Sequence, residues 1–68
     1  MTARIVNVYY DPEGDFLDVI FDRAPGYFID TDRDEVMSKV AMDGRFIGFQ
    51  IIGVTKLKGA PIEVKLTP

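Results

Sequence analysis

The chain has no cysteine and no histidine. The first absence excludes disulfide bonds and thiolate-held zinc or iron–sulfur sites. The second removes the side chain that most often binds transition metals and acts as a general base near neutral pH. Ser38 therefore has no partner for triad chemistry, and a Ser–Lys pair would require a buried lysine such as Lys39. These absences predict a protein that is not an enzyme, with no catalytic residue and no cofactor.

Long apolar runs and an excess of basic residues are also missing. No segment approaches the roughly 18 apolar residues of a transmembrane helix, and no basic segment followed by an apolar one opens the chain as a signal peptide. We therefore expect a soluble, cytoplasmic protein with no membrane partner. The net charge of −3 argues against binding to nucleic acid through phosphate neutralisation.

The charge is unevenly divided along the chain. Residues 1–35 carry three basic and nine acidic side chains, whereas residues 36–68 carry five basic and two acidic ones. In most proteins such a division is only solvated surface. The alternative is that patches of opposite sign meet when two copies associate.

With 68 residues, the chain forms one small β domain that covers residues 1–68. A chain of this size buries only ~60% of the surface that its unfolded form exposes, so its stability is marginal. Self-association is the remaining way to bury more surface, since disulfides are excluded. We therefore expect a homo-oligomer.

The clearest structural pattern is a hairpin over residues 36–54, centred on Asp43-Gly44. Asp-Gly between two apolar runs favours a two-residue type I′ turn, which needs positive φ at both residues. In that register Met42 faces Arg45, and Phe46 lies beside Ala41 on the outer face. The other face is lined by Val36, Ser38, Val40, Ile47, Phe49 and Ile51.

Residues 4–10 and 16–22 predict a second hairpin, because Asp11-Pro12-Glu13-Gly14 between them has the preferences of a type I turn. Its register pairs Tyr10 with Leu17 and Val8 with Val19. Residues 27–30 are typical of a short strand, and residues 62–66 of a last strand at an edge, because apolar and charged residues alternate there. These elements predict an all-β fold: a small antiparallel meander of five or six strands, curled or barrel-like so that its apolar face is covered.

Residues 32–42 also fit a helix. Thr31 followed three residues later by Asp34 resembles a capping box, and Val36, Met37 and Val40 would form a helical stripe. This alternative would give an α+β fold. We favour the strand, because the register around Asp43-Gly44 separates apolar from polar residues so well.

Two segments carry recognisable motifs. Residues 10–19 read Tyr-Asp-Pro-Glu-Gly-Asp-Phe-Leu-Asp-Val, and residues 43–52 read Asp-Gly-Arg-Phe-Ile-Gly-Phe-Gln-Ile-Ile. Both resemble the motifs of a small prokaryotic family, domain-of-unknown-function family 2283. The resemblance implies a small β-rich fold and transfers no catalytic residue.

The acidic turn is a candidate for a metal site, with Asp11, Glu13 and Asp15 as ligands. A calcium-binding EF-hand loop needs glycine at its sixth position and a helix on either side. Phe16 holds that position here, and the flanking residues are typical of strands. We therefore expect these acids to shape the turn rather than to bind a cation.

Six residues are candidates for an interface between subunits. Tyr9, Tyr27 and Phe46 are candidate exposed aromatics, and the acidic surroundings of the two tyrosines favour a protein contact over single-stranded nucleic acid. Ile62, Val64 and Leu66 would line the last strand. We prefer a non-enzymatic, homo-oligomeric interaction module. The alternatives are an antitoxin-like regulator of a small partner protein and a carboxylate-based metal- or ligand-binding module.

Overall fold

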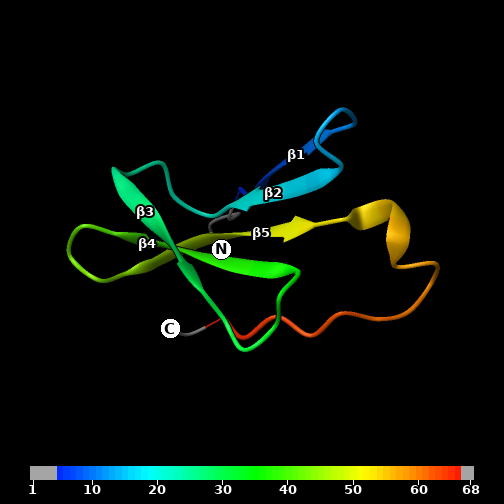
Figure 1. The fold of residues 1–68 in the computed structure, drawn as a ribbon. Helices are drawn as coiled ribbons and strands as arrows, with labels where there is room; N and C mark the ends of the chain where they lie inside the picture. Colours follow the sequence, from blue (N-terminus) through cyan, green and yellow to red (C-terminus); the bar gives the residue numbers. More distant parts are fainter. Residues whose placement is uncertain (1–4, 67–68) are drawn as a thin grey trace.

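The computed structural model describes residues 5–66. It is one antiparallel sheet with the strand order β1-β2-β5-β4-β3, so that β1 and β3 are its edges (Figure 1). The elements are β1 (Asn7–Asp11), β2 (Phe16–Ile20), β3 (Gly26–Asp30), β4 (Val36–Ala41), β5 (Phe46–Ile52) and a 3₁₀ turn, η1 (Val54–Lys56). The all-β prediction is confirmed. The sheet is not closed into a barrel, and the alternative helix over residues 32–42 is wrong.

The first hairpin has the predicted register. Tyr10 pairs with Leu17 and Val8 with Val19. The turn between the strands is held by Asp11, whose Oδ1 accepts the N–H groups of Glu13 (2.9 Å) and Gly14 (3.1 Å). An aspartate that accepts from the following backbone in this way stabilises a turn without any cation.

The turn of the central hairpin differs from the prediction. Its loop has three residues, because the N–H of Gly44 donates to the carbonyl of Ala41 (2.9 Å) and the N–H of Ala41 donates to that of Arg45 (2.8 Å). Gly44 has a φ of 92°, whereas Asp43 is not among the described residues with positive φ. A type I′ turn is therefore excluded. The geometry is that of the three-residue hairpin loop, which ends on a left-handed glycine.

A second irregularity compensates for the longer loop. The ladder between β4 and β5 shifts by one residue at Ile47, so that Val40 pairs with Phe46 and Lys39 with Gly48. Beyond this bulge the predicted pairs are restored, including Ser38 with Phe49. The bulge also turns Phe46 away from the predicted face. Its ring packs edge-on against that of Phe21, with 5.4 Å between the centroids.

Thr31 starts a turn rather than a helix. Its hydroxyl accepts the N–H of Arg33 (3.1 Å) and donates to the carbonyl of Val36 (2.8 Å). The second bond ties the turn to the first residue of β4. The capping-box resemblance thus marks a real Ser/Thr turn, but the chain leaves it as a strand because Val36 pairs with Ile51.

The buried core is confined to the two central strands. Val36, Val40, Ala41 and Ile47 are buried together with Ser38, and all five lie in β4 or β5. The rings of Phe21, Phe46 and Phe49 extend this core toward β2. Neither edge strand contributes a buried residue.

The segment after η1 is not a strand. It leaves η1 and runs back beside the sheet toward the connection between β3 and β4 (Figure 1). Ile62 and Val64 are partly buried and Leu66 is exposed, but none is paired in the sheet. The predicted strand at 62–66 is therefore wrong. The alternation of its residues correctly indicates two different sides, but a strand also needs a free sheet edge beside it, and this segment lies against residues that project from a face.

Candidate interaction surface

The β1 edge exposes a row of large apolar side chains. Val8 is 63% exposed and Tyr9 is 60% exposed. The whole row consists of Ile5, Val6, Val8, Tyr9 and Tyr10. No described residue pairs with the outer side of β1, and no charged residue occurs between positions 5 and 10. Natural edge strands are usually protected by charges, prolines or bulges, and this edge lacks all three up to Asp11.

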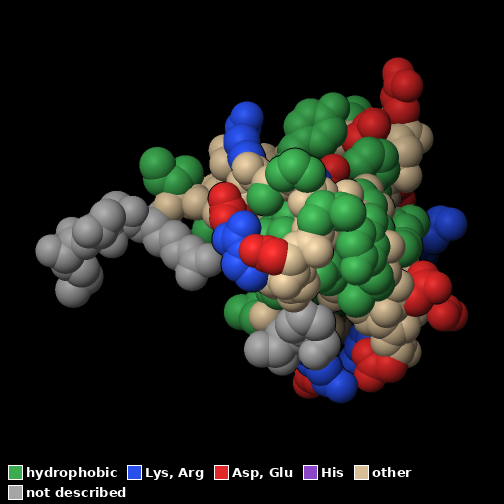
Figure 2. Space-filling model, turned by 90° about the vertical axis from the view of Figure 1, so that its left-hand side faces the viewer, with side chains coloured by type: hydrophobic (Ala, Val, Ile, Leu, Met, Phe, Trp, Pro, Cys, Tyr) green, Lys and Arg blue, Asp and Glu red, His purple; other side chains and the backbone are tan. Residues whose placement is uncertain are grey.

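The β3 edge is more polar in its surroundings. Tyr27 and Phe28 are exposed, but Pro25 precedes the strand and Asp30 ends it. The ammonium of Lys39 lies 5.7 Å from the ring centre of Phe28, which gives this ring a cation–π partner. Figure 2 views the side of the molecule that carries this edge and shows apolar side chains gathered in the middle, with acidic and basic ones around them.

The six predicted interface residues do not form one surface. Tyr9 and Tyr27 lie on opposite edges of the sheet. Phe46 belongs to the ring cluster with Phe21, while Ile62 and Val64 are partly covered. The prediction missed Val8 and Tyr10, which alternation alone assigns to the inner face of a covered strand.

Next to Tyr9, on the neighbouring strand β2, Asp18 has a carboxylate oxygen without a hydrogen-bond partner among residues 5–66. Asp18 pairs with Tyr9 on one side and Gln50 on the other. Its Oδ1 is buried and makes no hydrogen bond within residues 5–66. An unsatisfied buried acceptor destabilises the fold, so the β1–β2 region is the less complete part of the sheet.

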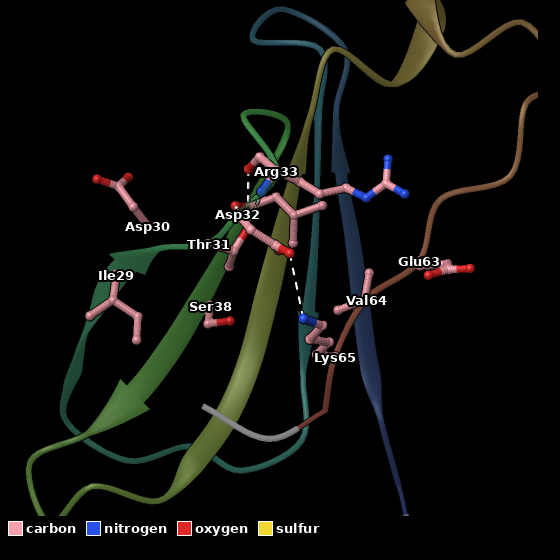
Figure 3. Close-up of a pocket in the computed structure, with 10 residues that line it drawn as sticks. Ile29, Asp30, Thr31, Asp32, Arg33, Ser38, Glu63, Val64 and Lys65 are labelled. Carbon is pink, nitrogen blue, oxygen red and sulfur yellow. Dashed lines mark hydrogen bonds and ion pairs between the residues drawn. The ribbon is translucent and has the colours of Figure 1, made fainter.

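A groove separates the C-terminal segment from the sheet (Figure 3). Its volume is about 480 Å³, and it lies between residues 29–38 and residues 63–65. Ile29, Val36, Ser38 and Val64 supply the less polar part of its lining. A long ion pair, 3.4 Å between Lys65 Nζ and Asp32 Oδ2, crosses its rim. Both partners are largely exposed, so the pair closes the groove only loosely.

Ser38 lies at this groove without the surroundings of a nucleophile. It is buried, as predicted for a small residue on the core face. Lys39 is its neighbour on a strand and therefore points to the other face, where it lies over Phe28. Lys65 is exposed and paired with Asp32. Neither lysine thus meets the condition for a Ser–Lys pair, which is burial beside the hydroxyl.

The acidic turn is used for internal contacts. Asp15, with a φ of 55°, accepts hydrogen bonds from the hydroxyl of Thr55 (2.7 Å), the N–H of Thr55 (3.1 Å) and the hydroxyl of Tyr10 (3.2 Å). The bond from the Thr55 hydroxyl is the largest cause that lowers the pKa of Asp15. We call this set of contacts, which fastens the β1–β2 turn to η1, the Asp15 clip. Asp11 is engaged by the backbone of its own turn.

The three acids that were candidate metal ligands do not form a cluster. Among residues 5–66, no three histidine, cysteine, aspartate or glutamate side chains lie close enough together to hold a metal ion. Asp11, Glu13 and Asp15 follow one another along the turn without converging on one point. The same part of the chain contains no helix long and apolar enough to cross a membrane.

No protein-family model matches the chain, and no characterised protein or solved structure is significantly similar to it. The resemblance to family 2283 therefore stays a prediction. What the chain does has to be argued from the chemistry of its own surface.

Proposed function

We propose that the chain is a non-enzymatic interaction module that assembles with copies of itself. The observation that carries this proposal is the β1 edge, where a strand side that no residue of 5–66 pairs with coincides with exposed apolar residues and with no charged residue between positions 5 and 10. Such an edge favours pairing with another strand. A contiguous apolar patch on the surface of a small protein often marks a site of contact with another molecule.

The energetics of the isolated chain support the same proposal. Among residues 5–66, only four apolar side chains are buried. Burying one large apolar side chain contributes ~1.5–3 kcal/mol. Covering the exposed parts of Val8, Tyr9 and Tyr10 in an assembly would therefore add to the burial that this core provides. An oligomer gives so small a sheet the stability that its own core does not provide.

The non-enzymatic part of the proposal is supported by the surroundings of the two candidate groups. Among residues 5–66, Ser38 is the only buried polar or charged residue, so no buried basic side chain lies beside it. The carboxylate of Asp15 is held in its ionised form by donors from Thr55 and Tyr10. A general acid or base instead needs a pKa near the working pH. Screening the purified chain against generic hydrolase and phosphatase substrates tests this part, and turnover that exceeds background would overturn it.

Light scattering after size-exclusion chromatography tests the assembly. The chain is expected to elute as an oligomer at micromolar concentration. Val8→Lys places a charge on the β1 edge and is expected to shift the population toward monomer. Met42→Lys is the matched control, because Met42 is 74% exposed in the β4–β5 turn and away from β1. A stable monomer at all concentrations, or equal effects of the two variants, would contradict the proposal.

The cytoplasmic location expected from the sequence also belongs to this proposal. Fractionation of cells that express a tagged copy of the chain tests it, and recovery of the protein outside the cytoplasmic fraction would contradict it.

A further inference from the structure

We infer that two copies join through their β1 strands, antiparallel and in the register that places Val8 opposite Val8 of the second copy. The five strands of each copy would then form one continuous sheet across a two-fold axis. This inference rests on the proposed function and specifies its contact surface, its partner and its register.

The directions of the backbone groups identify which residues of β1 are free to pair. In β2, the N–H of Phe21 donates to Ile47 (2.9 Å), and the carbonyl of Asp15 accepts from Gly53 (2.7 Å). Along a strand, the N–H and C=O groups of successive residues point alternately to the two neighbouring strands. In β2, the groups of odd-numbered residues therefore point toward β5, and those of even-numbered residues point toward β1. Their partners in β1 are Asn7, Tyr9 and Asp11. The N–H and C=O groups of β1 that point away from the sheet therefore belong to Val8 and Tyr10, and the same alternation extended by two residues assigns those of Val6, just before the strand.

These three residues are symmetric about Val8, which selects the register. With Val8 opposite its own copy, Val6 meets Tyr10 of the second copy twice. All three residues then lie in hydrogen-bonded pairs, which gives about six inter-copy hydrogen bonds. A register centred on Tyr9 would bring Val6 opposite Pro12, which has no N–H to donate. A register centred on Asn7 leaves Tyr10 without a partner among residues 5–66.

The side chains also fit this register. Val6 against Tyr10 is a pair of a β-branched and an aromatic residue, which is favourable across antiparallel strands. Val8 meets Val8 on the same face, and Asn7 meets Tyr9 on the other. No charged side chain lies opposite a like charge, since residues 5–10 carry none. Around the β3 edge, Asp30, Asp32 and Asp34 would bring several negative charges into any pairing of two copies.

A two-fold contact also explains why such an edge is tolerated. Pairing β1 with β1 consumes the exposed edge of both copies and closes the assembly. Pairing β1 with β3 of another copy would leave one free edge at each end and continue without limit. The proline before β3 and the aspartate at its end oppose that open arrangement.

Cysteine cross-linking tests the inference cleanly, because the chain has no cysteine of its own. Asn7→Cys and Tyr9→Cys are exposed substitutions at two positions that face each other in the inferred register. The Cα atoms of such a non-hydrogen-bonded pair are ~4.5 Å apart, within the range that a disulfide spans. Two copies of the same variant place their cysteines ~8 Å apart, since two residues along a strand add ~6.8 Å. That separation is too long for a disulfide.

The two variants are oxidised separately and as an equilibrated mixture, and the products are separated by mass. The expected result is a mixed disulfide that forms several-fold faster than either disulfide between identical variants. Faster self-linkage of Asn7→Cys or of Tyr9→Cys would overturn the register. Phe28→Cys is the control on the β3 edge, and linkage there with none on β1 would overturn the choice of edge. Light scattering on the unmodified chain separates the two failures, because an oligomer without β1 linkage sinks only this inference, whereas a monomer sinks the proposed function as well.

Discussion

The centre of the sheet and its β1 edge have similar apolar composition but opposite surroundings. Ile47 in β5 is 1% exposed, whereas Ile5 beside β1 is 75% exposed. The difference comes from position in the strand order, since β5 has neighbours on both sides and β1 has one. It shows that apolar content along a strand does not determine burial. The two regions therefore respond differently to the same substitution, and that difference can be measured.

The largest effect is expected from removing the side chain of Ile47. Ile47→Ala leaves a cavity in the core that β4 and β5 form and should lower the free energy of unfolding by about 2–5 kcal/mol. Ile5→Ala makes the same chemical change at the exposed edge and should alter stability by less than about 0.5 kcal/mol. Urea unfolding at a concentration below that of assembly measures both values. Equal losses would mean that the centre and the edge are equally packed.

The next largest effect concerns the backbone spacing in the centre. A methyl group added at Gly48 would lie 2.5 Å from the carbonyl oxygen of Val19, in a strand that has neighbours on both sides. Gly48→Ala should therefore cost about 1–3 kcal/mol. Gly26→Ala brings a methyl group even closer to the carbonyl oxygen of Val40, but Gly26 begins an edge strand that can move outward. Urea midpoints should fall further for the central variant, and the reverse order would show that the edge is the stiffer region.

The same contrast explains which parts of the fold could be predicted. Tyr10 with Leu17 and Ser38 with Phe49 were predictable, because turn chemistry and alternation act between residues close in sequence. The three-residue loop ending at Gly44 and the bulge at Ile47 were not, because each cancels the other's shift and leaves the outer pairs unchanged. The exposure of Val8 was not predictable either. It depends on β2 lying beside β5, and that neighbour is set by long-range packing rather than by the local pattern.

In the candidate site too, features that depend on residues close in sequence could be predicted, and those that depend on distant residues could not. The absence of cysteine and histidine narrowed the chemistry expected from the sequence, and the acids of the first turn were expected to shape it, as Asp11 does. The Asp15 clip could not be predicted, since its donor at Thr55 is 40 positions away in the chain. Tyr9 was identified from its aromatic character alone. Its neighbours Val8 and Tyr10 were not predicted as interface residues, because the rule that places alternate apolar residues inside assumes that this face of the sheet is covered.

The Asp15 clip should make part of the edge hairpin's stability depend on pH. Its hydrogen bonds lower the pKa of Asp15 from the ordinary value of 3.8. A lowered pKa in the folded state stabilises the fold above the unfolded value and loses that contribution as the pH falls through the folded value. Asp15→Asn should therefore flatten the decline in the urea midpoint between pH 5 and more acidic conditions. Asp43 has a lowered pKa as well, so Asp43→Asn is the matched control for an acid in the other turn.

A different outcome for the two acids would refine the comparison. Asp15 connects the β1–β2 turn to η1, which is 40 positions away in the chain, whereas the Asp43 carboxylate accepts hydrogen bonds from Arg45, two residues away in the same turn. Amide exchange should therefore speed up in β1 for Asp15→Asn and remain confined to the β4–β5 turn for Asp43→Asn. Equal exchange throughout both variants would mean that the clip does not fasten the edge hairpin.

The smallest effect is expected for the ion pair that links the two regions. Arg45 Nη1 lies 2.9 Å from Asp22 Oδ2 and joins the central turn to the end of the first hairpin, with about half of each side chain exposed. Exposed pairs of this kind contribute little, because solvent and salt screen them. Asp22→Asn should shift the urea midpoint less than Ile47→Ala or Gly48→Ala does, and added salt should remove the shift. The control is Asp32→Asn, which loses the longer pair to Lys65 at the groove. If Asp22→Asn instead lowered the urea midpoint as much as Ile47→Ala, the first hairpin would be as tightly coupled to the fold as the central strands. The first hairpin would then belong to the packed centre of the sheet rather than to its exposed edge.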